Sequence, residues 1–306
     1  MRERILRAAL AAGEDRKAAA AMRADEARTR ALAVPEIARA NSAYREAVYG
    51  AALTRTPLSD EKKRSLRKAY TDALAAHGFS ESDFEPAPAC PVCGGSGIRG
   101  GAPCECIRED YMALLQKECG LDADGYALED FDAAKIPDPE QGKLLGALYS
   151  AMQGLVAKYP DVNRRIIVFS GGTGTGKTVI AEAMARQMLR KGLPALFMSA
   201  MSLDRLMLTV HTARTPEDRA ALDDAMSADM LVIDDLGTEP RYRNVTCEYL
   251  LLLLSERARS GLVTVITTNL SPDRILARYN ERIYSRMYDK RHALAVSLGG
   301  GDMRGM

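Results

Sequence analysis

A glycine-rich loop, two adjacent aspartates and a cluster of four cysteines are the parts of this 306-residue chain whose residue types and spacing suggest chemistry. The loop follows the apolar run IIVFS and precedes a helical pattern, which is the context of a phosphate-binding P-loop. Its glycines let backbone N–H groups converge on phosphate oxygens, and the next helix adds its dipole. The alternative is a turn that binds nothing. Because every fixed position is filled, we expect an ATP site built from Gly171, Gly172, Thr173, Gly174, Thr175, Gly176, Lys177 and Thr178.

The two aspartates follow the apolar run MLVI, which predicts a buried strand that ends in two carboxylates. Thr178 and Asp234 are expected to hold Mg²⁺, and Asp235 to orient or deprotonate the attacking water. Asn269 follows the next apolar run, and an amide at this position of an AAA+ ATPase typically positions that water. The order of these residues predicts a P-loop ATPase of the AAA+ type.

Four cysteines lie close together on either side of a glycine-rich stretch: Cys90, Cys93, Cys104 and Cys106. This spacing predicts a structural zinc site, because four thiolates fill a tetrahedral ion and leave no position open for catalysis. An iron–sulfur cluster and unliganded or redox thiols are the alternatives. Cys119 and Cys247 lie outside the cluster and are expected to pack as small apolar residues.

Basic residues recur every four positions near the C-terminus, at Arg274, Arg278, Arg282, Arg286 and Lys290. If this segment is helical, they lie along one face. Such a stripe is either a solvated cationic face or a source of an arginine that reaches ATP across a subunit interface.

The surrounding elements fall into three expected parts. Residues 1–85 are rich in Ala, Arg, Glu and Leu and predict a helical N-terminal domain of about three helices. Residues 86–120 hold the cysteine module and a linker helix, and residues 121–306 are expected to form the ATPase domain. The runs IIVFS, ALFMS, MLVID, VTVIT and ALAVS alternate with helical stretches, so we expect an α/β fold with a five-stranded parallel sheet.

Composition and charge bear on where the protein resides, but they do not identify a binding partner. A formal net charge of +1 gives no global basic field, so any contact with nucleic acid must come from a local patch. The N-terminus lacks the apolar core of a signal peptide, and the longest apolar run, Tyr249 to Leu254, is too short to span a bilayer. The sequence therefore predicts a cytoplasmic protein with no membrane contact.

These motifs together resemble the DnaC/DnaI-type replicative helicase loaders, and particularly their zinc-containing branch. The segments that carry the resemblance occur in the family's order: CPVCGGSGIRGGAPCEC, GGTGTGKT, LVIDDLGTEP, ITTNL and NERIYSRMYD. The resemblance implies ATP, Mg²⁺ and Zn²⁺ as cofactors. It also implies that the N-terminal region grips a DnaB-type hexameric helicase, while the ATPase domain self-assembles and contacts single-stranded DNA.

The same resemblance implies roles for individual arginines. Arg286 is the expected arginine finger, with Arg282 as its neighbour, and Arg304 is expected to act as a sensor in its own subunit. Arg241 and Tyr242 follow the aspartates and offer a cation and a stacking ring to a DNA strand.

Two other readings are open. An IstB-like transposition helper shares the ATPase core, including a comparable LIIDDLG element, although the cysteine module argues against it. The stretch from Cys90 to Gly97 also fits the zinc unit of DnaJ-type cochaperones, which bind unfolded chains. Those proteins repeat the unit and lack a P-loop, whereas this chain has one copy and a full P-loop.

Overall fold

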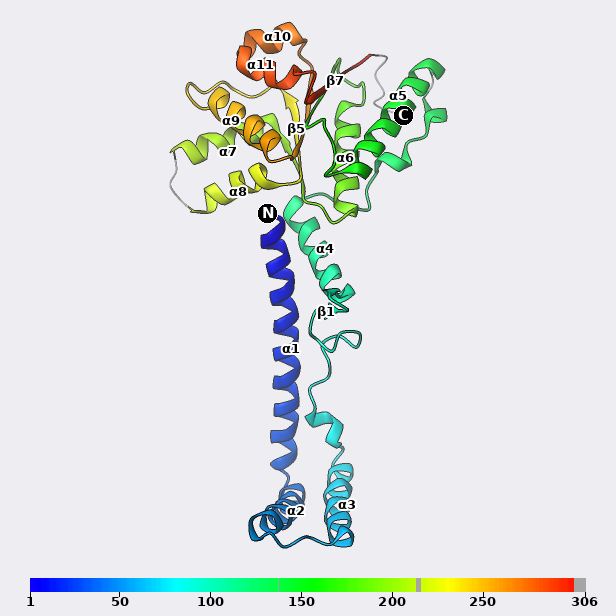
Figure 1. Ribbon diagram of the computed structural model, residues 1–306, viewed down its shortest axis with the longest axis vertical. Helices are drawn as coiled ribbons and strands as arrows, with labels where there is room; N and C mark the ends of the chain where they lie inside the picture. Colours follow the sequence, from blue (N-terminus) through cyan, green and yellow to red (C-terminus); the bar gives the residue numbers. More distant parts are fainter. Residues whose placement is uncertain (137, 213–215, 300–306) are drawn as a thin grey trace. The chain divides into compact units, whose positions relative to one another are not determined.

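The computed structural model describes residues 1–136, 138–212 and 216–299, without the side chains of residues 217 and 218. The chain divides into two compact units, one of residues 7–110 and the other of residues 1–6 with 111–306 (Figure 1). The boundary between the units therefore falls inside two helices, α1 (Arg2–Leu32) and α4 (Glu105–Cys119). Arg304, the expected sensor, lies outside the described residues.

The smaller unit consists mainly of helices and contains the cysteine segment. Its elements are α1 (Arg2–Leu32, from residue 7), α2 (Pro35–Thr54), α3 (Asp60–Ala76), η1 (Glu81–Phe84), β1 (Ile98–Arg99), β2 (Ala102–Pro103) and the start of α4 (Glu105–Cys119). The predicted helical N-terminal region is therefore observed, with helix ends close to Pro35 and Pro57. The cysteine segment packs in the same unit as these helices.

Local chemistry explains where these helices begin and which faces they bury. The hydroxyl of Ser59 accepts the N–H of Lys62 and caps α3. Along α1, small buried side chains recur at helical spacing: Ala20, Ala24, Ala27 and Ala31. Ala31 packs with Ile37 and Leu74 in a small apolar core. Alanine also has the highest helix propensity of all residues, so these positions favour the long helix itself.

The larger unit is an α/β domain around a parallel sheet. In the described part of the chain its strands are β3 (Ile166–Gly171), β4 (Ala195–Ser199), β5 (Met230–Leu236), β6 (Val263–Thr268) and β7 (Ala293–Leu298). They pair in the order β4-β5-β6-β3-β7, and every pairing is parallel. All strands are those predicted from the apolar runs. The parallel arrangement brings their carboxyl ends to one edge, where ligands bind in open α/β sheets.

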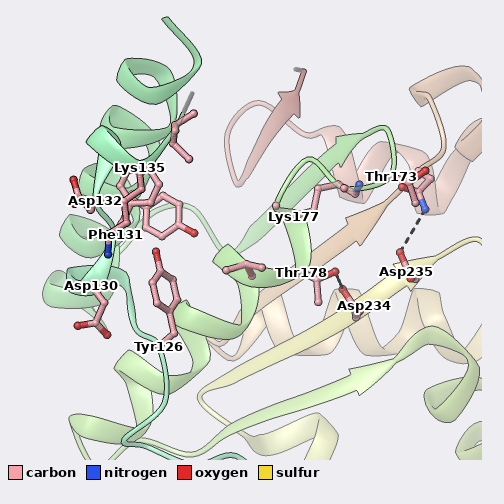
Figure 2. A pocket seen from close by; sticks show the side chains of 16 residues that line it. Tyr126, Asp130, Phe131, Asp132, Lys135, Thr173, Lys177, Thr178, Asp234 and Asp235 are labelled. Atoms are coloured by element: carbon pink, nitrogen blue, oxygen red, sulfur yellow. Dashed lines mark hydrogen bonds between the residues drawn. The ribbon is translucent and has the colours of Figure 1, made fainter. Parts of the chain in front are cut away.

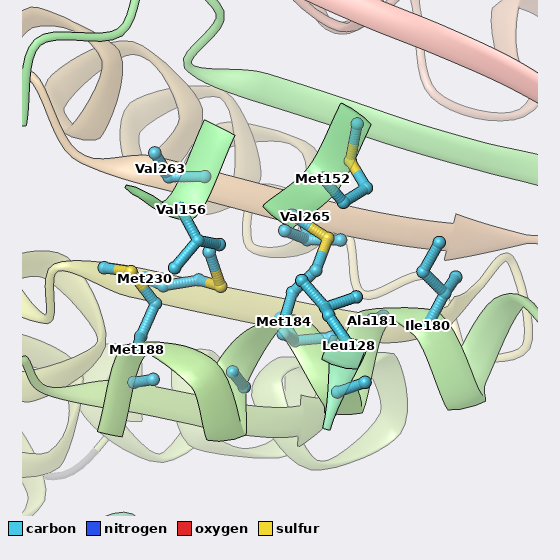
Figure 3. Packing of buried hydrophobic residues seen from close by; sticks show 14 of the residues in the cluster. Leu128, Met152, Val156, Ile180, Ala181, Met184, Met188, Met230, Val263 and Val265 are labelled. Carbon is cyan, nitrogen blue, oxygen red and sulfur yellow. The ribbon is translucent and has the colours of Figure 1, made fainter. Parts of the chain in front are cut away.

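Helices cover both faces of this sheet. They are α5 (Pro139–Lys158), α6 (Lys177–Arg190), α7 (Ala200–Thr212), α8 (Pro216–Ser227), α9 (Thr246–Arg259), α10 (Pro272–Arg278) and α11 (Glu281–Tyr288), with short 3₁₀ turns η2 (Leu128–Asp130) and η3 (Ala133–Lys135). Alternate strand residues point to opposite faces. Val232 and Val265 belong to the apolar cluster that contains residues of α5 and α6, and Figure 3 shows Val265 between them. Ile233 and Ile266 pack on the α7–α11 side.

The basic segment near the C-terminus departs from the expected single helix. It forms α10 and α11, which are separated at Tyr279 and Asn280, and Lys290 lies beyond α11. Asn280 has a φ of 159° and its side chain accepts the N–H of Ile283, so it starts a new helix. The expectation that five basic residues share one helical face is therefore wrong, because these residues lie on two helices and beyond the second. At the break, Tyr279 is 3% exposed and packs into the core.

None of the described helices is both long and apolar enough to cross a lipid bilayer.

Candidate nucleotide site and metal centre

The glycine-rich loop joins β3 to α6 at the carboxyl edge of the sheet. Gly171 has a φ of 145°, and a Cβ there would lie 2.1 Å from the carbonyl oxygen of Leu298 on β7. Gly176 precedes the first residue of α6 and has a φ of 85°, which favours glycine. The loop therefore follows a path that side chains at these two positions would block, and it presents backbone N–H groups at the start of α6.

The side chain of Lys177 folds back into the glycine-rich loop. Its ammonium donates to the carbonyl oxygens of Gly171 at 3.1 Å and Gly172 at 2.6 Å. Thr175 is also buried, and its hydroxyl donates to the same Gly172 carbonyl at 2.9 Å. These contacts hold the positive charge at the N-terminus of α6, where the helix dipole also favours an anion.

The carboxylate of Asp234 meets two hydroxyls at the end of β5. Thr178 donates to Asp234 Oδ1 at 2.9 Å, and Thr267 donates to the same oxygen at 2.7 Å. Thr267 lies on β6, the strand between β5 and β3. The structure therefore brings together the expected Mg²⁺ residues, and it adds a threonine that the sequence reasoning missed.

A β-bulge shapes the end of β5. Ile233 pairs with Ile266 and Leu236 pairs with Thr268, so two aspartates lie opposite the single residue Thr267. Asp235 has a φ of 54°, an unusual conformation for a residue other than glycine, and its N–H donates to the Thr267 hydroxyl at 2.8 Å. Asp235 Oδ1 lies 3.5 Å from the side-chain nitrogen of Asn269. The bulge turns the second carboxylate toward the expected water-positioning amide.

These residues line one pocket of about 660 Å³ (Figure 2). Thr173, Gly174, Gly176, Lys177 and Thr178 form one side of it, with Asp234, Asp235 and Asn269. The facing wall comes from two segments that sequence reasoning did not identify. One holds Tyr126, Asp130, Phe131, Asp132, Lys135 and Ile136, and α5 adds Tyr149. The rings of Phe131 and Tyr149 stack with their centroids 4.1 Å apart. The pocket thus joins a phosphate-binding loop to an aromatic wall.

Two arginines of α6 hold the start of this wall. Arg186 donates to the carbonyl oxygens of Asp122 and Tyr126, each at 3.1 Å, and pairs with Glu182 at 2.6 Å. Arg190, one turn later, donates to the carbonyl oxygens of Ala123 at 2.8 Å and Gly125 at 3.1 Å. Because α6 begins at the phosphate loop, the same helix positions both sides of the pocket.

The expected finger residues lie away from this pocket. Arg282 and Arg286 are exposed on α11, where they line a shallow hollow with Leu251, Ser255, Glu281 and Ser285. Arg278 differs, because its guanidinium pairs with the buried carboxylate of Glu239 at 3.5 Å. Arg241 and Tyr242 are exposed on the loop between β5 and α9 and do not line the pocket.

The four clustered cysteines converge on one point. The sulfurs of Cys90 and Cys104 are 3.9 Å apart, those of Cys93 and Cys106 are 3.8 Å apart, and all four lie within 4.8 Å of one another. Sulfurs at about 2.3 Å from a tetrahedral zinc lie about 3.8 Å from one another. The donor set and its spacing therefore fit a structural zinc ion.

Backbone geometry around Cys93 also suits a thiolate. Burial raises the pKa of the Cys93 thiol, but the N–H groups of Gly97 and Gly95 and the neighbouring thiols outweigh this effect and lower it to about 6. The Gly97 nitrogen lies 3.3 Å from the Cys93 sulfur. Donors that stabilise a thiolate are the usual surroundings of a metal-binding cysteine.

Comparison with known proteins identifies the ATP-binding part of the chain. The model of the family "IstB-like ATP binding protein" matches residues 151–304, which is half of the 306-residue chain. The replicative helicase loader DnaC of Escherichia coli (strain K12) is 28% identical over 129 residues, which cover 42% of this chain and 51% of that protein. DnaC of Buchnera aphidicola subsp. Acyrthosiphon pisum (strain APS) is 28% identical over 186 residues, 59% of this chain and 72% of that protein.

A solved structure of the DnaC helicase loader aligns with 57% of this chain and 98% of its own, with a TM-score of 0.46 and 22% identity. The chain spans about half the length of the E. coli relative that it matches. The expected resemblance to helicase loaders is confirmed. The family match and the parallel five-stranded sheet with its glycine-rich loop also confirm the expected P-loop fold. The family match does not include residues 1–150, which hold the N-terminal helices and the cysteine cluster.

Proposed function

Because the chain belongs to the family of IstB-like ATP-binding proteins, we propose that it hydrolyses ATP and loads a DnaB-type replicative helicase onto single-stranded DNA. One observation carries this proposal. Lys177, Thr178 and the carboxylate of Asp234 converge at the sheet edge, in a chain whose curated relatives are named replicative helicase loaders.

ATP fits the two-sided pocket with its phosphates on the loop and its base on the aromatic wall. The N–H groups at the start of α6 and the ammonium of Lys177 attract the phosphates. Phe131, which is half-buried and backed by the stacked ring of buried Tyr149, offers flat apolar surface to the adenine. Stacking of a base on an aromatic ring contributes about 1–3 kcal/mol. Thr178 and Asp234 would hold Mg²⁺, which supplies charge neutralisation at the β- and γ-phosphates.

Hydrolysis needs a positioned water and a source of positive charge. Asp235 orients the attacking water or accepts its proton, and Asn269 holds the same water from the next strand. Arg286 is exposed and does not line the pocket of its own subunit. We assign it to the ATP site of a neighbouring subunit, so that turnover depends on self-assembly.

The parts of the chain outside the ATP site are assigned to the helicase, to zinc and to single-stranded DNA. We assign the helical residues 1–85 to the helicase, and the zinc module of residues 86–120 to a structural role beside them. Residues 121–306 then form the ATPase domain, with single-stranded DNA as its ligand and Arg241 and Tyr242 as candidate contacts on an exposed loop. Arg304 stays a candidate sensor.

A loading assay tests the proposal. The helicase from the same source, a single-stranded circle and an annealed labelled oligonucleotide are mixed with ATP, with and without this protein. We expect oligonucleotide displacement to depend on the protein and to fail with Lys177→Ala. Displacement that is equally fast without the protein would contradict helicase loading and favour another DNA-remodelling role, such as that of a transposition helper.

A further inference from the structure

A buried acid lies just beyond the aspartate pair and takes no part in lining the nucleotide pocket. Glu239 follows β5 by three residues, and the residue is 3% exposed. A carboxylate is rarely buried unless its oxygens are paired, because removing the charge from water is costly. Its partners therefore show what the residue holds together.

On one side Glu239 binds its own loop. Its Oε2 accepts the N–H of Gly237 at 2.8 Å, which closes the turn that begins at Asp235. Gly237 has a φ of 111°, and a Cβ there would lie 2.6 Å from Leu270, the residue after Asn269. The turn after β5 is thus closed by Glu239 and packs closely against Leu270, which follows β6.

On the other side Glu239 binds the junction between α10 and α11. Its Oε1 accepts the hydroxyl of Tyr279 and lies 3.5 Å from a guanidinium nitrogen of Arg278. Arg278 also donates to the backbone carbonyl of Glu239. Tyr279 is 3% exposed and belongs to the core on this face of the sheet. These contacts anchor Tyr279, which follows α10 and directly precedes Asn280, the N-cap of α11.

The chemistry of the contact requires a carboxylate. All the groups that meet the two carboxylate oxygens are donors: an amide N–H, a phenol hydroxyl and a guanidinium. A glutamine whose oxygen accepts the Gly237 N–H would turn its NH₂ group toward Tyr279, whose hydroxyl can accept, and toward the guanidinium of Arg278, which cannot. The opposite placement would turn the NH₂ group toward the Gly237 N–H. Hydrogen bonds that involve a charged group are about twice as strong as neutral ones, so the contact is specific and stiff.

We propose that Glu239 is a positioning residue that couples the end of β5 to α11, and through α11 sets the place of Arg286 relative to the subunit's own ATP site. A nucleotide that shifts Asp235 would shift this turn, and the turn would carry the change to the junction at Tyr279. The role given to Arg286 rests on the proposed function, whereas the coupling between β5 and α11 does not depend on it.

The first test is hydrogen exchange of residues 281–288, measured on the purified full-length protein alone with and without the ATP analogue ATPγS. We expect the analogue to slow exchange in α11 of the parent by at least about threefold. In Glu239→Gln the analogue binds within about threefold of the parent affinity, yet the change in α11 is lost. Tyr279→Phe, which removes one donor and keeps the ring, serves as a second variant if Glu239→Gln unfolds.

Asp204→Asn is the matched control. Asp204 is also a buried acid, 2% exposed, and lines the same small cavity as Glu239, but its hydrogen bond goes to Thr246 at 2.6 Å and not to α10 or α11. This variant should keep the response of α11 to the analogue. A response that persists in Glu239→Gln and Tyr279→Phe, or that is absent from the parent, would overturn the coupling.

Kinetics then connect the coupling to the reaction. A misplaced catalytic group costs up to about a hundredfold in rate, so Glu239→Gln is expected to lower the assembly-dependent kcat about tenfold with little change in KM. In the Arg286→Ala background the same substitution should have no further effect. If the double variant instead loses rate by the product of the two single losses, Glu239 does not act through Arg286. An Arg286→Ala rate equal to the parent's would refute the finger and leave the exchange result standing.

Discussion

Asp234 shows how much of the site the residues themselves determine. Its position after a buried strand and the P-loop motif together predict a magnesium carboxylate, and the contact with Thr178 at 2.9 Å agrees with that geometry. Thr267 could not be predicted in the same way, because threonine is common in strands. It becomes a site residue only because β6 lies between β5 and β3. Residues at motif positions can thus be predicted from the sequence, whereas residues that reach the site only through the order of the strands cannot.

At the residue scale we predict that Lys177→Ala weakens ATP binding by roughly a hundredfold, or about 3 kcal/mol, because a charge-assisted contact to phosphate is lost. Titration of a fluorescent ATP analogue measures this directly. Lys143→Ala, an exposed lysine on α5 paired with Glu140 at 3.0 Å, is the control and should bind normally. Unchanged affinity in Lys177→Ala would remove the site assignment.

A second prediction concerns the metal. Protein purified under reducing, chelator-free conditions should contain one zinc per chain, and Cys90→Ser should lose it, because the sulfur spacing fits a four-thiolate ion. Elemental analysis measures the content, and thermal unfolding should show a less stable N-terminal unit in the variant. Cys247→Ser, which lies outside the cluster, should keep the zinc. Metal-free parent protein would refute the site, and iron in place of zinc would indicate a cluster.

At the scale of elements, the strands could be predicted because each is an apolar run bounded by polar or turn residues. The break between α10 and α11 could not, since the four-residue spacing of arginines continues across it. Packing of Tyr279 into the core and its contact with Glu239 decide that break, and both depend on residues distant in sequence. The aromatic wall was missed for the same reason. Phe131 lies between η2 and η3, and it meets Tyr149 only when this segment folds back on α5.

The aromatic wall gives a prediction that belongs to this scale. Phe131→Ala should weaken ATP binding about tenfold, or about 1.4 kcal/mol, through loss of stacking with the base. Binding of inorganic triphosphate should not change, because the phosphate loop does not depend on this ring. Calorimetry with both ligands separates the two effects. An equal loss for ATP and triphosphate would mean that Phe131 shapes the whole pocket and does not contact the base.

At the scale of the whole molecule, the exposed position of Arg286 predicts that one subunit completes the site of another. Arg286→Ala should keep ATP affinity but lose assembly-dependent hydrolysis, by a factor of about a thousand or more. Mixing Arg286→Ala with Lys177→Ala should restore part of the rate. Each variant is inactive alone, but an intact ATP site can then meet an intact arginine.

Arg274→Ala is the matched control for this experiment, because Arg274 is also exposed but lies on α10. It should hydrolyse ATP at the parent rate. A mixture as inactive as its components would exclude an arginine that acts between subunits. Parent-like rates for Arg286→Ala would leave Arg282, the neighbouring exposed arginine on α11, as the candidate.

Native mass spectrometry of this protein mixed with the DnaB-type helicase from the same source tests helicase loading most directly. With ATP and Mg²⁺ present, we expect a defined complex with several copies of this chain on each helicase hexamer. Lys177→Ala under the same conditions gives the nucleotide dependence of that complex. Free hexamer and free chain as the sole species, with and without ATP, would contradict the assignment as a helicase loader.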